Sequence, residues 1–226
     1  MYYSHIKKGI FISRPNRFIA YVRLDDRTVT CHVKNTGRCK ELLIPGTEVL
    51  LQYHPEAKAS GRKTEYSLIA VYKVRPGHKE NLLINMDSQA PNQAAFQWLS
   101  EKSSIKSLRR EVSYGNSRFD LAFLQKKGSF FPNGDSDILK NTDTDWQQAY
   151  MEVKGVTLEE KGIARFPDAP TVRGLKHVDE LADMAQKGIP CFLLFVIQMK
   201  EIALFEPNME THPEFGLALS RAAKAG

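Results

Sequence analysis

The chain has 226 residues, enough for one large domain or two small ones with a proper hydrophobic core. Hydrophobic residues make up 42% and charged residues 26%, a balance typical of a soluble globular protein. No apolar run is long enough for a signal peptide or a membrane span, so the sequence predicts a cytoplasmic protein that does not associate with membranes.

The three cysteines, Cys31, Cys39 and Cys191, are too few and odd in number for a disulfide framework. We therefore expect reduced thiols. Cys31, His32 and Cys39 match no zinc-binding spacing and lack a fourth ligand, so solvent-facing or core thiols are the favoured interpretation.

The net charge of +6 is concentrated in the first third of the chain. Residues 1–80 contain 15 Lys and Arg against seven Asp and Glu, whereas residues 81–226 contain 17 against 19. This asymmetry indicates an anionic partner for the first part, and it favours nucleic acid. A basic surface that has no partner is the alternative.

Short β-rich runs dominate the first 85 residues. They lie at 10–12, 18–24, 28–33, 48–53 and 66–74. A hairpin signal, residues 25–27, separates two of them. About five short strands in 75 residues predict a small barrel, and an OB-like barrel is the commonest basic version.

Basic and aromatic residues alternate in this part, a mixture that suits stacking on bases while charges follow the backbone. Single strand aromatics, however, are more often part of the core. Turn residues at 35–37 lie beside further cations, and this turn is predicted either to hold a phosphate or only to cap a loop. The candidate DNA-binding residues are Arg14, Arg17, Phe18, Lys34, Asn35, Arg38 and Lys40.

The rest of the chain predicts a mixed α/β domain. A helix at 91–102 precedes strands at 106–112 and 118–124, and residues 125–148 are predicted as a long, mobile hairpin loop. The next strand contains residues 150–154. The remaining elements are a helix at 172–186 with a buried stripe of Leu175, Val178, Ala182 and Ala185, a buried central strand at 191–197, a strand at 201–205 and a helix at 214–225.

Two of the predicted strands carry residues that could form a catalytic site. Alternation places Glu152 and Lys154 on one face, and Asp120 occupies a similar position on a strand that can pair with theirs. Two carboxylates suit Mg²⁺ or Mn²⁺, and Lys154 can steady an attacking water or a developing phosphorane charge. Glu111 is a possible third acid. The alternative is an ordinary solvated strand face, on which Glu and Lys two apart are common.

The chain also resembles the sugar fermentation stimulation protein A family along nearly its whole length. The matching segments are 14–18, 32–38, 111–115, 118–120, 150–158, 166–169 and 171–181. The resemblance implies an OB-like DNA-binding domain at residues 1–85 and a PD-(D/E)xK nuclease-like domain, with the order αβββαβ, at residues 86–226. It also implies a non-specific DNA-binding protein linked to the regulation of sugar utilisation.

Carried over by position, Asp120, Glu152 and Lys154 match the nuclease triad, with Glu111 as the auxiliary acid. The Val153 carbonyl would be a further metal ligand. Phe119 stands where the motif has proline, and the loop at 125–148 is longer than the family pattern. Family members also continue beyond the position of Gly226 into another short strand.

The start of the helix at 172–186 adds a polar group to the same predicted cleft. Its members are Asp168, Arg173, Lys176 and His177. A histidine on a helix is often a simple surface residue, and the resemblance is what favours a role for His177. Two functions therefore stay open, which are DNA binding without turnover and a Mg²⁺-dependent DNA phosphodiesterase.

Overall fold

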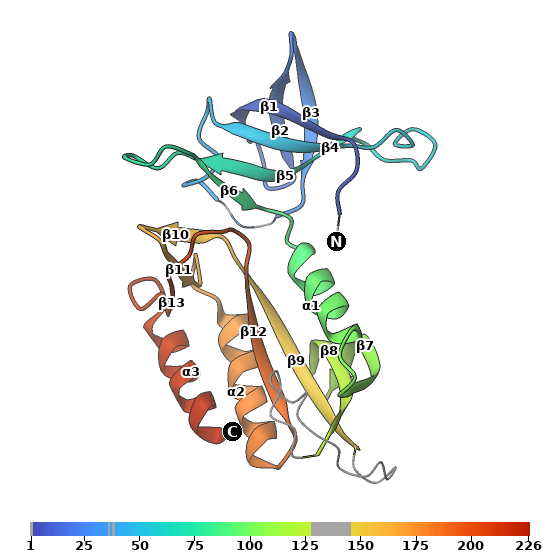
Figure 1. Ribbon diagram of the computed structural model, residues 1–226, viewed down its shortest axis with the longest axis vertical. Coiled ribbons are helices and arrows are strands. Elements are labelled where there is room, and N and C mark those ends of the chain that lie inside the picture. The colour runs from blue at the N-terminus through green and yellow to red at the C-terminus, as the bar shows by residue number, and fades with distance from the viewer. Residues whose placement is uncertain (1, 36, 38, 128–145) are drawn as a thin grey trace. The chain divides into compact units, whose positions relative to one another are not determined.

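The computed structural model describes residues 2–35, 37, 39–127 and 146–226. Two compact units can be separated, Met1–Ala90 with Ile197–Ala203, and Pro91–Val196 with Leu204–Gly226. In the described part of the chain, no helix is long and apolar enough to cross a membrane. The elements are shown in Figure 1.

The first unit is a closed β-barrel with one added strand. Its sheet has the order β3-β2-β1-β4-β5-β6, and a parallel pairing between β3 and β5 closes the first five strands into a barrel. This confirms the predicted OB-like architecture. The strands are β1 (Ile6–Ser13), β2 (Ile19–Leu24), β3 (Arg27–Val33), β4 (Glu48–Tyr53), β5 (Tyr66–Lys73) and β6 (Leu82–Asn85).

Alternation along the strands separates the barrel core from the outer face. In β3, Val29, Cys31 and Val33 are buried in the core, whereas His32 points the other way and is half-buried. Burial raises the pKa of the Cys31 thiol to about 12. Cys31 and His32 therefore lie on opposite faces of the strand and cannot share a metal ion.

A segment from late in the chain completes the first unit. Ile84 of β6 forms a β-bridge with Met199, and the Asn85 backbone N–H donates to the Gln198 carbonyl at 2.9 Å. The Gln198 side chain in turn donates to the carbonyls of Asn85 and Asp87. These contacts assign Ile197–Ala203 to the barrel unit, which no sequence pattern indicated.

The second unit contains a four-stranded sheet, a small three-stranded sheet and three helices. The four-stranded sheet has the order β12-β9-β8-β7, and the small sheet has the order β10-β11-β13. The elements are α1 (Ala90–Ser100), β7 (Ile105–Tyr114), β8 (Ser117–Lys126), β9 (Trp146–Val156), β10 (Leu158–Glu160), β11 (Ile163–Phe166), α2 (Val172–Gln186), β12 (Cys191–Ile197), β13 (Leu204–Pro207) and α3 (Pro213–Ala225).

Helices pack against both faces of the four-stranded sheet. Leu99 of α1 clusters with Met151 of β9, whereas Leu181 of α2 clusters with Tyr150. Because Tyr150 and Met151 are consecutive strand residues, they point to opposite faces. The αβββαβ order is thus confirmed, with two additional short strands, β10 and β11, between β9 and α2.

The structure corrects three expectations for this unit. The strand at 191–197 was predicted to be central, but β12 is at the edge of the described sheet and its residues are only half-buried. The final short strand, β13, begins at Leu204 instead of 201, because the preceding residues belong to the barrel unit. The predicted loop at 125–148 is shorter, since β8 continues to Lys126 and β9 starts at Trp146. The remainder of that predicted loop, 128–145, lies outside the described residues.

Helix α2 has the predicted bounds, but its buried face is turned relative to the predicted stripe. Only Val178 is common to both sets. The fully buried residues are Gly174, His177, Val178, Leu181 and Met184. A histidine and a glycine on the buried face weaken the apolar pattern, which is why the periodicity pointed slightly off the true face.

Candidate functional site

The carboxylates of Asp120 and Glu152 come together where β8 and β9 diverge. The antiparallel ladder between these strands runs as far as Leu121, which pairs with Met151. Beyond this pair the Asp120 carboxylate accepts the Val153 backbone N–H at 2.8 Å. A side chain thus replaces the neighbouring strand as the acceptor, which fixes Asp120 against the strand that carries Glu152.

Glu152 is held through only one of its two oxygens. Its Oε1 accepts from Lys154 Nζ at 2.5 Å and lies 2.6 Å from His177 Nδ1. Its Oε2 is buried and has no hydrogen-bond partner in the described part of the chain. The Glu152 side chain is 5% exposed and that of Lys154 is 14% exposed. A buried carboxylate oxygen without a donor is costly, so Oε2 is a natural ligand for a cation.

Asp120 experiences an unfavourable environment for its own charge. Burial raises the pKa of its carboxyl, and the nearby negative charge of Glu152 raises it further. Hydrogen bonds from Val153 and Asn92 and the charge of Lys154 act in the opposite direction. Two carboxylates that repel each other in a partly buried site are an arrangement that a divalent cation would relieve.

The sequence did not reveal the contribution of Asn92. This residue lies in the first turn of α1, and its side-chain amide donates to Asp120 Oδ1 at 2.7 Å. In the sequence, Asn92 marked only the start of a helix, and a contact across 28 positions has no local signal.

Helix α2 brings His177 to the site. The Thr171 hydroxyl accepts the Gly174 backbone N–H at 3.0 Å and caps the helix, which fixes where α2 begins. His177 then lies six residues later, is 4% exposed, and meets the Phe119 ring edge-on with the centroids 5.9 Å apart. The structure thus brings His177 into contact with Glu152, while its role stays a prediction.

The other acids and bases predicted for the cleft are exposed and make no hydrogen bond or ion pair with Asp120 or Glu152 among the described residues. Glu111 lies on β7 between two residues that pair with Leu121 and Phe119, on either side of Asp120. Glu111 pairs with Arg118 at 2.6 Å, and both side chains are more than half exposed. Lys176 pairs with Glu180 along the helix surface at 3.5 Å. Asp168 and Arg173 are exposed and have no ion pair with another described residue. Arg173 precedes His177 by one turn of α2 and is exposed at the start of the helix, whereas Lys176 is turned away from the buried side.

The residues present fit a divalent metal ion with few protein ligands. In the described ranges, no three His, Cys, Asp or Glu side chains lie close enough to hold a metal ion by themselves. Mg²⁺ usually takes one or two carboxylates and keeps several waters, so Asp120 and the unpartnered oxygen of Glu152 suffice.

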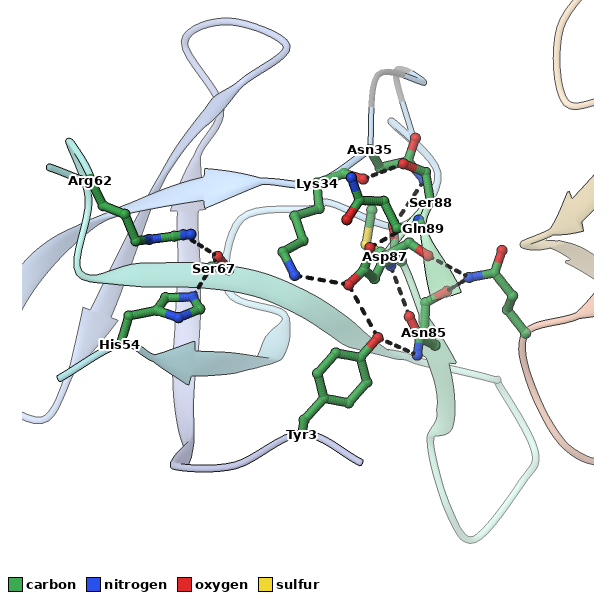
Figure 2. Close-up of polar contacts among 12 residues, drawn as sticks. Tyr3, Lys34, Asn35, His54, Arg62, Ser67, Asn85, Asp87, Ser88 and Gln89 are labelled. Atoms are coloured by element: carbon green, nitrogen blue, oxygen red, sulfur yellow. Dashed lines mark hydrogen bonds and ion pairs between the residues drawn. The ribbon is translucent and has the colours of Figure 1, made fainter. Parts of the chain in front are cut away.

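The candidate DNA-binding residues divide into two groups. The Arg14 guanidinium donates to the carbonyls of Asn35, Gly37 and Arg17, and thereby holds the turn at residue 35 in place. Lys34 pairs with the buried carboxylate of Asp87 at 3.1 Å, as Figure 2 shows. These contacts indicate that Arg14, Lys34 and Asn35 shape the surface.

The second group faces solvent. Arg17, Phe18 and Lys40 are exposed, with the Arg17 guanidinium 5.9 Å from the centre of the Phe18 ring. An exposed aromatic ring beside a cation is the kind of platform on which a base can stack. Arg38 lies outside the described residues.

Known proteins share both units of this chain. A family model described as the sugar fermentation stimulation protein RE domain matches residues 89–226, and one described as the SfsA N-terminal OB domain matches residues 12–78. Sugar fermentation stimulation protein homologs from Clostridium beijerinckii and Ruminiclostridium cellulolyticum are 46% and 47% identical, over 100% of this chain and 89% of theirs. The solved structure of Pyrococcus furiosus SfsA in complex with Ca²⁺ has a TM-score of 0.77 at 26% identity, over 100% of this chain and 87% of that chain.

Proposed function

The chain belongs to the sugar fermentation stimulation protein family, and we propose that it is a non-specific DNA-binding protein linked to the regulation of sugar utilisation. The observation that carries the proposal is the excess of positive charge on the barrel. Residues 1–80 hold 15 Lys and Arg against seven Asp and Glu. OB-like barrels bind oligonucleotides, and a basic surface supplies the sequence-independent attraction to phosphates.

The test is the salt dependence of binding to two labelled duplexes of unrelated sequence, followed by fluorescence anisotropy. We expect similar affinities for both, and a logarithmic plot of affinity against salt with a slope of about −0.9 for each phosphate contacted. Absence of binding at low salt, or binding that salt does not weaken, contradicts the proposal.

A second candidate function is a metal-dependent DNA phosphodiesterase. The observation that favours it is the buried Glu152 Oε2, which has no hydrogen-bond donor among the described residues. It lies near the Asp120 carboxyl, whose pKa is raised by burial and by the charge of Glu152. Asp120 and Glu152 would hold Mg²⁺ or Mn²⁺, and Ca²⁺ in the Pyrococcus furiosus relative is in keeping with a divalent ion. A bound divalent ion would polarise a phosphoryl oxygen and lower the pKa of a water ligand.

The protein's own groups would then have distinct tasks. Lys154 places a positive charge beside the carboxylates, where negative charge develops on the phosphoryl group during attack. His177 and Lys154 both contact Oε1 of Glu152, so Oε2 would be the oxygen that holds the ion. The Asn92 amide and the Val153 N–H each donate to a different oxygen of Asp120 and so fix the orientation of its carboxylate.

Cleavage of single- and double-stranded DNA in Mg²⁺, in Mn²⁺ and in EDTA tests this second function. Glu152→Gln is the matched variant, since an amide keeps an acceptor for Lys154 but is a far poorer ligand for Mg²⁺. We expect cleavage that needs the metal ion and is lost in the variant. Equal cleavage by wild type and Glu152→Gln would identify a contaminating nuclease.

A further inference from the structure

The outer face of the barrel carries a group of basic side chains that is separate from the acidic site. His32 lies on β3, His54 directly follows β4, and Arg62 lies in the loop between β4 and β5. They surround Ser67 of β5, because His32 is the strand partner of Ser67 and the other two hydrogen-bond to its hydroxyl. Figure 2 shows Arg62 and His54 converging on Ser67.

Ser67 fixes the positions of the two side chains that reach it. Arg62 Nη2 donates to Ser67 Oγ at 3.1 Å, and His54 Nε2 lies 2.9 Å from the same oxygen. Ser67 is completely buried, and in the neutral form of His54 with its proton on Nδ1 the Ser67 hydroxyl donates to Nε2. In protonated His54, Nε2–H donates to the Ser67 oxygen instead, and Nδ1–H stays available to a ligand.

The burial of Ser67 excludes a catalytic role for Ser67 and His54. A hydroxyl that donates to a histidine resembles the nucleophile and base of a hydrolase. Ser67 Oγ, however, belongs to a residue with 0% exposure, and no substrate could reach it. The serine therefore acts as an anchor for the side chains around it.

The surrounding side chains keep donors that no group in the described part of the chain uses. Arg62 is exposed, and its only side-chain contact among the described residues is the bond to Ser67. Within those same residues, nothing hydrogen-bonds to the His32 ring or to His54 Nδ1. The loop that carries Arg62 is fixed by its own backbone, since Arg62 N–H donates to the Ala57 carbonyl at 2.9 Å.

The charges around the group are predominantly positive. Lys34 is the neighbouring cation, and Asp87 is the one carboxylate that influences His32, although it is already paired with Lys34. Burial lowers the pKa of His32 and of His54, and the charges of Arg62 and Lys34 lower both further. The cluster therefore repels additional protons unless an anion is bound between its members.

We propose that His32, His54 and Arg62 form a phosphate-binding site on the outer face of the barrel, which takes a backbone phosphate of DNA and binds it more tightly when the histidines are protonated. The assignment to DNA rests on the proposed DNA-binding function. Fixed side chains with unused donors, an excess of positive charge and a position on an OB-like face together favour a phosphate oxygen as the ligand.

The direction of the pH dependence follows from linkage. A bound phosphate stabilises the charged imidazoles and so raises the pKa of His32 and His54 above their values in the free protein. Affinity for phosphate must then increase as the pH falls through the raised values, and it levels off below the pKa values of the free protein. Arg62 stays charged throughout this range.

Two measurements test the site. The first is a pH titration of the histidine ring C–H signals by NMR, with and without inorganic phosphate. We expect phosphate to raise the pKa of His32 and His54 and to leave the other four histidines as internal controls. Arg62→Ala should reduce the rise. Unchanged His32 and His54 signals in saturating phosphate would overturn the site.

The second measurement is DNA binding by wild type, Arg62→Ala and Lys8→Gln at increasing salt. Lys8 is an exposed cation of β1, paired with Glu48, and its replacement removes the same charge from the barrel. We expect the salt slope to become shallower by about 0.9 in Arg62→Ala and to stay at the wild-type value in Lys8→Gln. Circular dichroism checks that both variants are folded.

The outcomes separate the two proposals. If wild type does not bind DNA, the proposed function fails, and the phosphate titration alone decides whether the site exists. If phosphate shifts the two histidines while Arg62→Ala binds DNA with the wild-type slope, the site serves free phosphate and its assignment to DNA is overturned. Equal slope changes in Arg62→Ala and Lys8→Gln would show a general charge effect and also refute the assignment.

Discussion

At the scale of single residues, the ionised carboxylate of Asp120 in the candidate metal site lowers the stability of the folded protein. Burial and the charge of Glu152 raise the pKa of Asp120 above its ordinary value of 3.8. The unfolded chain therefore ionises Asp120 at lower pH than the folded protein does. The raised pKa leaves stability unaffected below pH 3.8, lowers it as the pH rises from 3.8 through the folded-state pKa, and has its full effect above that pKa.

Asp120→Asn should consequently stabilise the metal-free protein at pH 7. The amide oxygen can accept the Val153 N–H, and the Asn92 amide can flip to accept from the new NH₂ group. We expect a higher thermal midpoint than wild type at pH 7 in EDTA, with a difference that disappears as the pH approaches 3.8. Differential scanning calorimetry across this range measures it.

Asp183→Asn is the control for this prediction. Asp183 is an exposed carboxylate on α2, so the same chemical change there should leave the midpoint nearly unchanged at every pH. A wild-type midpoint that equals or exceeds that of Asp120→Asn at pH 7 would show that the carboxylate is not strained in the folded protein.

The sequence identified Glu152 and Lys154 because their relation depends on neighbouring positions. It missed the contacts that join residues far apart in the chain. Glu152 and Lys154 share a face because strand side chains alternate, a rule that needs only two neighbouring positions. Asn92 contacts Asp120 across 28 positions, and Lys34 pairs with Asp87 across 53 positions. Nothing short-range in the sequence specifies such contacts, so the prediction of Lys34 as a DNA-binding residue did not include its pairing with Asp87.

At the scale of elements, accuracy followed the strength of local signals. Helix α2 was predicted with its observed bounds because its apolar residues recur at helical spacing and Gly188 and Pro190 stop a helix. Strand β12 was predicted as central because its residues are uniformly apolar. Such a pattern predicts burial but does not indicate which strands lie beside it. Strands β10 and β11 were missed because three or four residues are too few to show a period.

The cap of α2 provides a test at this scale. Thr171 Oγ1 accepts the Gly174 N–H, and replacing a threonine cap by alanine typically costs about 1 kcal/mol. Thr171→Ala should therefore lower the thermal midpoint by roughly 2–4 °C for a chain of this size. Thr171→Ser keeps the hydroxyl and should recover most of the loss. Equal midpoints for the alanine and serine variants would show that the hydrogen bond contributes nothing.

At the scale of the whole molecule, charge and chemistry are divided between the two units. The basic excess belongs to residues 1–80, whereas residues 81–226 carry 17 basic against 19 acidic residues and contain both Asp120 and Glu152. Long-range attraction to DNA depends on summed charge, while cleavage would depend on a few buried groups. Binding and cleavage should therefore be separable by a single substitution.

Glu152→Gln is the substitution that separates them. It removes one negative charge from a side chain that is 5% exposed, so the field around the barrel changes little. We expect any metal-dependent cleavage to be lost, while the affinity for duplex DNA at fixed salt and without a divalent ion stays within about twofold of wild type. Arg62→Ala should show the reverse pattern at subsaturating DNA, with weakened binding and an intact acidic site. A folded Glu152→Gln protein that has lost most of its DNA affinity would mean that the second unit supplies the main contacts, against the division that the charges indicate.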